Sequence, residues 1–257
     1  MERATYTTYN TTIDRPGVRH LGAGDVHIWY ASLDVPKPSA ACLTSILAPD
    51  EEERAHRFLG PTDRHRFVVG RFTLRRILAY YCEADPAGLV FRYGPNGKPF
   101  LDPSRHRAIR FNLSHAEGIA LYAIAADGEV GIDVERRGSC QVDDAVARQY
   151  LSAREYAALR ALPLDAQERE FLRCWTWREA CLKAEGLGLA ASARTVDYCL
   201  VGRGPLAVGT ADAVPWRAAR WRVRELDLGD PYVAAVAVHG GARKVSFDRW
   251  EEMFVSS

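Results

Sequence analysis

Apolar and polar residues alternate with a period of two in a short segment near the middle of the chain. From Val130 to Val134 the apolar residues at even positions alternate with Gly131 and Asp133, and Glu135 continues the pattern. This alternation predicts a β-strand over 130–138 that sends alternate side chains to opposite faces. Asp133 and Glu135 would then lie side by side. Either they face water from an edge strand, or they bind a hard cation such as Mg²⁺, because buried unpaired carboxylates repel each other.

Similar patterns predict the other elements of the chain. Strands are expected at 26–30 and near 89–93, 109–113 and 119–125. Helices are expected from residue 49, from 61 to about 78, and from about 165 to 185. The helix at 49 begins with a proline followed by acids, and the helix dipole favours acids in the first turn.

The order strand, short helix, long helix recurs in the second half of the chain. A shift of 104 residues aligns Val26 with Val130 and Phe67 with Phe171. Such a recurrence indicates an internal duplication. We therefore expect an α+β fold of two similar subdomains related by a pseudo-twofold axis, each a small sheet packed with a long helix. The expected division is a leader at 1–24, an N-terminal subdomain at 25–129 and a C-terminal subdomain at 130–257, with the active site at their interface.

Composition narrows the class of protein. The net charge of +1 gives no overall field that favours nucleic acid or a membrane surface. The chain has no apolar run long enough to span a membrane and no apolar signal segment at its start, so a cytoplasmic protein is expected. Six scattered cysteines without a Cys-x-x-Cys pair indicate reduced thiols rather than zinc ligands or a disulfide framework. A duplication within one chain makes a monomer sufficient for one complete site.

A possible third acid lies on the predicted helix at 165–185. Trp175, Glu179 and Lys183 recur every four residues and therefore line one stripe of that helix. One interpretation is a weak surface Glu–Lys pair beside a core tryptophan. The other is that Glu179 joins Asp133 and Glu135 as a third ligand of a hard cation, with Lys183 as a phosphate partner.

Further candidates are polar groups that could contact phosphate. Ser114 and His115 follow the predicted strand at 109–113 and would lie in a loop, where they either donate to phosphate or simply end the strand. Lys98 lies in a turn whose Asn-Gly pair supplies positive φ, and a lysine in a turn is normally solvated. A basic face of the first two helices is formed by Arg54, Arg57, Arg64, Arg66 and Arg71, which suit phosphates but are also typical of a solvated surface.

Four of these segments occur together in one order. They are Asn96-Gly-Lys98-Pro99, Phe111-Asn-Leu-Ser114-His115, Val130-Gly-Ile-Asp133-Val-Glu135 and Trp175-Thr-Trp-Arg178-Glu179-Ala-Cys-Leu-Lys183. In this order and spacing, the chain resembles the Sfp-type phosphopantetheinyl transferases over roughly residues 45–240. The resemblance implies a pseudo-twofold α/β fold and an enzyme, a holo-[acyl-carrier-protein] synthase. Such an enzyme moves the 4'-phosphopantetheine arm of coenzyme A to a serine of an apo carrier protein and releases adenosine 3',5'-bisphosphate.

The resemblance also implies roles for individual residues. Asp133, Glu135 and Glu179 are similar to the Mg²⁺ ligands of the family, and Mn²⁺ can substitute because it accepts the same oxygen ligands. Glu179 is similar to the residue proposed as general base, directly or through a metal-bound water. The remaining implied contacts are with coenzyme A: phosphate contacts from Lys183, Ser114 and His115, a position near the nucleotide for Lys98, and phosphate contacts from Arg54 and Arg66 of the basic face.

The chain departs from the family pattern at three positions. Arg178 replaces a common lysine, Glu51 lies where relatives often have a basic residue, and Phe67 replaces a hydroxyl residue of some relatives. Glu51 therefore makes a poor phosphate contact, and Arg54 is the better candidate. Glu155 matches another recurring acid that helps to orient the site.

The expected partners are coenzyme A and the acyl, peptidyl or aryl carrier proteins of fatty-acid, polyketide or nonribosomal-peptide synthesis, with no nucleic acid or membrane. Because carrier proteins present acidic helices around their serine, we expect a basic or apolar strip beside the site. The alternative is a catalytically inactive homologue that binds coenzyme A or a carrier protein. A Mg²⁺-dependent phosphohydrolase is a third interpretation, but it gives no role to a groove for a protein partner.

Overall fold

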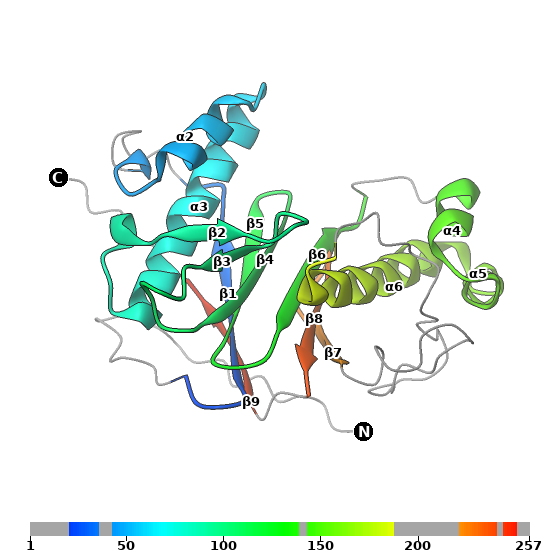
Figure 1. Ribbon diagram of the computed structural model, residues 1–257. Helices are drawn as coiled ribbons and strands as arrows, with labels where there is room; N and C mark the ends of the chain where they lie inside the picture. Colours follow the sequence, from blue (N-terminus) through cyan, green and yellow to red (C-terminus); the bar gives the residue numbers. More distant parts are fainter. Residues whose placement is uncertain (1–20, 36–42, 139–142, 188–220, 241–243, 251–257) are drawn as a thin grey trace.

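The computed structural model describes residues 21–35, 43–138, 143–187, 221–240 and 244–250 (Figure 1). These residues form an α+β fold with three sheets and, within the described ranges, five α-helices. The helices are α2 (Pro49–His56), α3 (Pro61–Cys82), α4 (Asp144–Tyr150), α5 (Ala153–Arg160) and α6 (Leu164–Glu185), with a 3₁₀ turn η1 (Pro86–Gly88). The strands are β1 (Asp25–Ser32), β2 (Phe91–Tyr93), β3 (Pro99–Leu101), β4 (Arg110–Ala116), β5 (Ile119–Ala125), β6 (Val130–Arg136), β7 (Trp221–Leu226), β8 (Tyr232–His239) and β9 (Lys244–Arg249).

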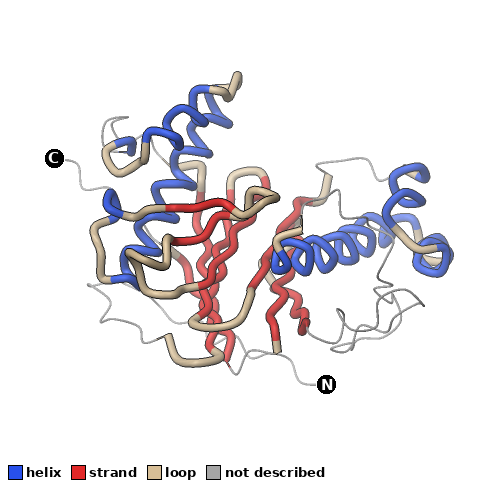
Figure 2. Tube along the Cα trace, viewed as in Figure 1, coloured by secondary structure: helices blue, strands red, loops and turns tan. Residues whose placement is uncertain are grey.

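Two larger sheets lie between two long helices. One sheet has the order β4-β5-β1-β9 and the other has the order β6-β8-β7, while β2 and β3 form a separate hairpin. Figure 2 shows these strands in the middle of the molecule, with α3 on the outer side of the first sheet and α6 on the outer side of the second (labels in Figure 1). The arrangement buries both faces of the inner strands β5 and β8 and most of β6, whereas the edge strands β7 and β9 keep exposed residues.

Alternation along the strands builds separate layers of core. Ile28, Leu121 and Ile132 are fully buried in the apolar cluster between the two sheets. Their neighbours along the chain point the other way: Trp29 and Tyr122 belong to a second cluster, which the α3 side chains complete. Strands β1 and β5 thus contribute to two layers at once, which is why β5 contains no charged residue.

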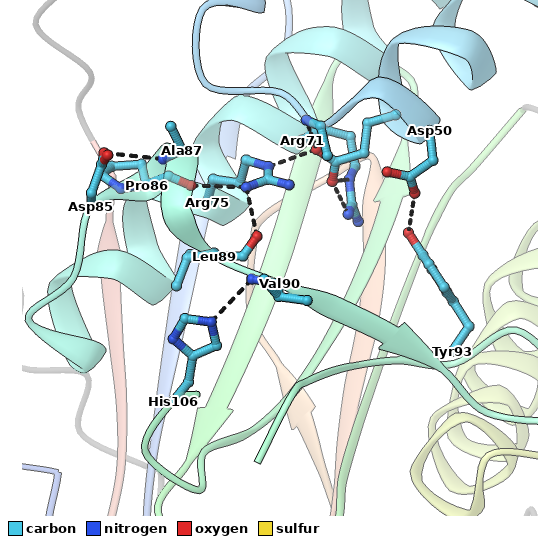
Figure 3. A network of polar contacts seen from close by, with 12 residues as sticks. Asp50, Arg71, Arg75, Asp85, Pro86, Ala87, Leu89, Val90, Tyr93 and His106 are labelled. Atoms are coloured by element: carbon cyan, nitrogen blue, oxygen red, sulfur yellow. Dashed lines mark hydrogen bonds and ion pairs between the residues drawn. The ribbon is translucent and has the colours of Figure 1, made fainter. Parts of the chain in front are cut away.

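A buried glutamate ties the short helix α2 to the long helix α3. Glu51 accepts hydrogen bonds from Arg71 Nε at 2.7 Å and from Arg75 Nε at 2.6 Å. Arg75 also donates to the carbonyls of Pro86 at 2.8 Å and Leu89 at 3.1 Å, on the approach to β2 (Figure 3). Its guanidinium therefore holds two helices and the start of the hairpin together, as only a multidentate donor can.

The second half contains a similar tie. Glu155 accepts from the backbone N–H of Ser152 at 2.9 Å in a capping box, and Arg178 of α6 donates to it at 3.1 Å. The short helices α2 and α5 both have 8 residues, and the long helices α3 and α6 both have 22. These matched lengths agree with a duplication, which stays a prediction.

The α+β class and the predicted helices are confirmed, but some boundaries differ. Strand β4 extends to Ala116, so the prediction that Ser114 and His115 lie in a loop is wrong. Strand β9 runs parallel to β1 and joins the first sheet, so this sheet contains chain from both predicted subdomains. Residues 1–20 of the predicted leader lie outside the described residues. Cys82, Cys174 and Cys181 are free thiols, and the other three cysteines lie outside the described ranges.

No helix in the part of the chain that the structure describes combines the length and the apolar character that a membrane span requires.

Gly131 allows α6 to lie directly on β6. A Cβ atom at this position would lie 1.9 Å from the carbonyl oxygen of Ala180 and 2.4 Å from the amide nitrogen of Ala184. Both contacts are with helix backbone, so no side-chain rotation can relieve them. Small residues on both elements thus set the distance between β6 and α6.

We expect Gly131→Ala to lower the free energy of unfolding by roughly 3 kcal/mol, because the added methyl forces helix and strand apart. The measurement is unfolding in denaturant followed by circular dichroism. Gly70→Ala in α3 is the matched control, since its Cβ would meet only ordinary contacts at 3.6 Å and 3.7 Å. That substitution should be neutral or slightly stabilising within a helix. Equal stability of the two variants would contradict the close approach.

Candidate functional site

Three carboxylates meet where β6 faces α6. Asp133 and Glu135 lie on the same face of β6, and Glu179 reaches them from α6. Asp133 is 3% exposed and Glu179 is 8% exposed, while Glu135 is half-buried. Although β6 is an edge strand of its own sheet, the interpretation that its acids simply face water is therefore wrong.

The electrostatics of the cluster reflect burial and mutual repulsion. Burial raises the pKa of Asp133 above its ordinary value. Burial and the neighbouring Asp133 charge raise the pKa of Glu135 to about 7, and the same two causes raise the pKa of Glu179. A raised carboxylate pKa means that the charged form lacks stabilisation. A cation bound among the three acids would supply the missing stabilisation of their charged forms.

Lys183 supplies one positive charge to this cluster. Its Nζ lies 2.6 Å from Asp133 Oδ1 and donates to Ser114 Oγ at 2.9 Å. Ser114 in turn donates to the same Asp133 oxygen at 2.9 Å. Lys183 therefore pairs with the strand that its helix covers, and the alternative of a surface Glu179–Lys183 pair is wrong.

The other oxygen of Asp133 is the feature that most suggests a metal. Asp133 Oδ2 is buried and finds no hydrogen-bond partner in the described part of the chain. Within the same residues, no three potential ligands already stand in a metal-binding arrangement. The residues nevertheless fit a hard cation, because three carboxylates of raised pKa provide oxygen ligands and one of them keeps an unpartnered oxygen in the interior.

The predicted stripe on α6 is confirmed by its contacts with β6. Trp175 Nε1 donates to Glu135 Oε1 at 3.2 Å, and Lys183 binds Asp133 two turns further along the helix. The ring of Trp175 packs edge-on against Tyr150 at a centroid distance of 4.6 Å. This packing fixes the indole, so the indole can orient the Glu135 carboxylate.

Strand β4 brings its polar residues to the edge of β6. Ser114 is buried against Asp133, whereas the side chain of His115 keeps access to solvent. Surrounding protein atoms and the Lys183 charge lower the pKa of His115, and the charge of Arg54 lowers it further. Arg54 from α2 therefore lies within electrostatic range of His115. Sequence reasoning missed Asn112, whose Oδ1 accepts from the backbone N–H of Ile132 at 2.9 Å and joins β4 to β6.

The predicted basic face is only partly formed. Arg54 is exposed, with its guanidinium 5.5 Å from the ring centre of Phe67. Arg66 instead makes two hydrogen bonds with Asp34, at 2.7 Å and 2.8 Å, and Arg71 is buried on Glu51. The prediction that Arg71 belongs to this face is therefore wrong, because sequence spacing does not reveal a buried counter-ion. Of the two arginines predicted to bind phosphate, only Arg66 is held in an ion pair with another described residue.

The predicted turn lysine is not solvated. Lys98 has a side chain only 18% exposed, and its Nζ donates to Glu129 Oε2 and to the carbonyl of Ala184, both at 2.8 Å. Burial lowers the pKa of this lysine. Its predicted position near the nucleotide of coenzyme A stays a prediction.

Comparisons with known proteins identify the family of this chain. A family model described as the 4'-phosphopantetheinyl transferase superfamily matches residues 129–237, and one described as the N-terminal part of 4'-phosphopantetheinyl transferase matches residues 36–128. The 4'-phosphopantetheinyl transferase HetI of a Nostoc species is 36% identical over 232 residues, which are 90% of this chain and 94% of the relative.

More distant relatives have the same description. Sfp of Bacillus subtilis, also a 4'-phosphopantetheinyl transferase, is 28% identical over 148 residues, which are 57% of this chain and 63% of that protein. A phosphopantetheinyl transferase of a Thraustochytrium species is 26% identical over 209 residues, 77% of this chain and 72% of the relative. The three facing acids, the α+β fold and the near full-length similarity to HetI together show that this chain belongs to the 4'-phosphopantetheinyl transferase superfamily of enzymes.

Proposed function

We propose that this protein transfers the 4'-phosphopantetheine arm of coenzyme A to a serine of an apo acyl, peptidyl or aryl carrier protein. The transfer depends on Mg²⁺ and releases adenosine 3',5'-bisphosphate. The observation that carries the proposal is the buried, unpartnered oxygen of Asp133 beside two carboxylates of raised pKa. The names of the relatives support phosphopantetheine as the transferred group.

The metal and its ligands follow from that cluster. Asp133 Oδ2, Glu135 and Glu179 would hold Mg²⁺ together with oxygens of the coenzyme A diphosphate. The bound ion supplies charge screening of the diphosphate and stabilises negative charge on the leaving phosphate. Lys183 and Ser114 keep the other oxygen of Asp133 occupied, so this carboxylate would present a single oxygen to the cation.

Side chains around the acids that can donate hydrogen bonds would bind the remaining phosphates. Lys183 lies beside the cluster, His115 keeps its ring accessible, and Arg54 lies within electrostatic range of that ring. These three groups come from α6, β4 and α2, so they would surround coenzyme A from both halves of the protein. Arg66 is held by Asp34, so its phosphate contact is the weaker expectation.

The transfer is a nucleophilic substitution at the β-phosphorus of coenzyme A. The serine oxygen of the carrier forms a bond to the β-phosphorus while the bond from that phosphorus to the bridging oxygen breaks. Glu179, which reaches the acids of β6 from α6, would receive the serine proton, directly or through a bound water. The released nucleotide carries the electron pair of the broken bond as phosphate charge.

Intact mass spectrometry of an apo carrier protein tests the transfer. After incubation with the protein, coenzyme A and Mg²⁺, the carrier should gain roughly 340 Da, the mass of one phosphopantetheine. Asp133→Asn should reduce the rate by about 100-fold or more, because it removes a charged ligand without changing the shape of the side chain.

Glu53→Gln on the exposed surface of α2 is the control and should keep the wild-type rate. No mass gain with several carrier proteins, while coenzyme A still binds in a titration, would favour the alternative of an inactive binding protein. Hydrolysis of coenzyme A without transfer would instead indicate a phosphohydrolase.

The raised pKa of Glu135 makes stability depend on pH in a defined direction. Without metal, the folded protein holds the Glu135 proton up to about pH 7, whereas the unfolded chain releases it near the ordinary value of 4.5. The contribution of Glu135 to stability therefore falls as pH rises through this interval. We expect metal-free Glu135→Gln to melt at the same temperature as wild type at pH 4.5 and several degrees higher at pH 8, at about 3 °C per kcal/mol.

Magnesium should reverse the order of the two melting temperatures, so that the wild type melts above Glu135→Gln. At pH 8 the ion stabilises the wild type by mass action, and it should stabilise Glu135→Gln much less because one charged ligand is missing. Differential scanning fluorimetry at pH 4.5, 6 and 8 measures the melting temperatures of both proteins. Each pH is measured without Mg²⁺ and with about 10 mM Mg²⁺, which suffices for a weak site. A melting difference independent of pH and Mg²⁺ would contradict the assigned position of Glu135.

A further inference from the structure

The last turn of α6 exposes carbonyl groups that its own backbone cannot satisfy. The helix ends at Glu185, and Gly186 follows in the left-handed conformation with φ of 68°. The N–H groups of Gly186 and Leu187 return to the carbonyl of Leu182 and its neighbour, which closes the end of the helix. The carbonyls of Ala184 and Gly186 then need donors from elsewhere.

The turn between β2 and β3 supplies both donors. Lys98 Nζ donates to the carbonyl of Ala184 at 2.8 Å, and Asn96 Nδ2 donates to the carbonyl of Gly186 at 2.9 Å. The aliphatic part of Lys98 also packs against Gly186. A positive charge at the carboxyl end of a helix is favourable because it complements the helix dipole. The hairpin turn of the first half is thus attached to the helix end of the second half.

The same ammonium group also contacts the start of β6. Lys98 Nζ lies 2.8 Å from Glu129 Oε2, directly before β6, and 3.4 Å from the carbonyl of Val130, the first residue of the strand. One side chain therefore joins three segments that are distant in sequence. Since an ammonium group has three donors, these protein oxygens use all of them.

The joined segments lead directly to the catalytic cluster. Ala184 follows Lys183 directly in the chain. On β6, Asp133 lies three residues beyond Val130. Because Gly131 lets helix and strand meet closely at this point, a small shift of the last helical turn would move Lys183 relative to Asp133. A shift of about 1 Å in a catalytic group can reduce a rate by up to about 100-fold.

We propose that Lys98 is a positioning residue, which acts through the last turn of α6 to hold Lys183 and Glu179 in place against Asp133. The expected effect on kcat rests on the proposed transferase function. It assigns Lys98 a role inside the protein rather than a contact with the nucleotide of coenzyme A. The two roles differ in the kinetic constant that they change.

The test replaces Lys98 by methionine, which keeps the aliphatic stem and removes the ammonium group. In the full-length protein, kcat should fall about 10-fold, whereas KM for coenzyme A should change less than about 3-fold. The ratio of rates with coenzyme A and with 3'-dephospho-coenzyme A should stay at the wild-type value. Hydrogen exchange of the segment 180–187 should become faster, while exchange in α3 should not change.

Two further variants separate this role from general stability. Arg110→Gln removes the other cation near Glu129, at 3.4 Å, without touching α6, and it should leave kcat and exchange at 180–187 unchanged. Asn96→Ala removes the second donor to the same helix end and should shift kcat and exchange in the same direction as Lys98→Met, by a smaller factor. If Lys98→Met does not fold, the Asn96 variant carries the same comparison.

The outcomes are distinguishable. A raised KM with unchanged kcat, together with lost discrimination between coenzyme A and its 3'-dephospho form, would overturn the proposal in favour of a nucleotide contact. Unchanged exchange at 180–187 would overturn it as well. Because exchange is measured without substrate, an inactive wild-type protein would contradict the proposed function but would still leave the positioning role testable.

Discussion

Repulsion among three clustered carboxylates, two buried and one half-buried, is the constraint on which the site depends. Asp133, Glu135 and Glu179 would not remain charged in a protein interior without compensation, and Lys183 supplies only part of it. A protein that kept such a cluster for stability alone would gain more from apolar residues of similar volume. The cost of the cluster is therefore best explained by binding of a cation and phosphate, and the surrounding fold can be understood as the scaffold that keeps the acids together.

The two halves use equivalent helix positions in opposite ways. A shift of 104 residues places Trp175 on Arg71 and Glu179 on Arg75. In the first half this stripe forms a buried ion pair with Glu51, which fixes α2. In the second half the stripe faces the acids of β6, and the tie to the short helix comes from the neighbouring Arg178. Because Arg178 makes this tie, Glu179 is left to face the acids of β6.

Much of this arrangement could be predicted from the sequence because it depends on periodicity. Alternation placed Asp133 and Glu135 on one face, and a four-residue spacing placed Trp175, Glu179 and Lys183 on one stripe. The composition of a single segment, in contrast, could not identify partners that come from elsewhere in the chain. Lys98 was expected to be solvated or near the nucleotide because its contacts with Glu129 and Ala184 connect segments that are distant in sequence.

The errors have the same physical origin. The sequence places Arg71 on the surface because a helix rich in arginines gives no sign of the buried acid that faces it. Polar residues such as Ser114 and His115 usually end strands, whereas here antiparallel pairing with β5 continues β4 through both residues to Ala116. In both cases a tertiary contact overrides the local preference.

The position of the site at the join between the halves has a mechanistic reason. Coenzyme A, the proposed co-substrate, carries several phosphates over an extended length, and the side chains proposed to contact it come from both halves. The acids and Lys183 come from β6 and α6, whereas His115 and Arg54 come from β4 and α2. Asn112 on β4 and Lys98 on the hairpin attach these two sets of elements to each other without adding to the chemistry. The proposed transfer requires a rigid join, because the acids proposed to hold the cation and the side chains proposed to bind phosphate have to keep a fixed separation while the serine oxygen approaches phosphorus.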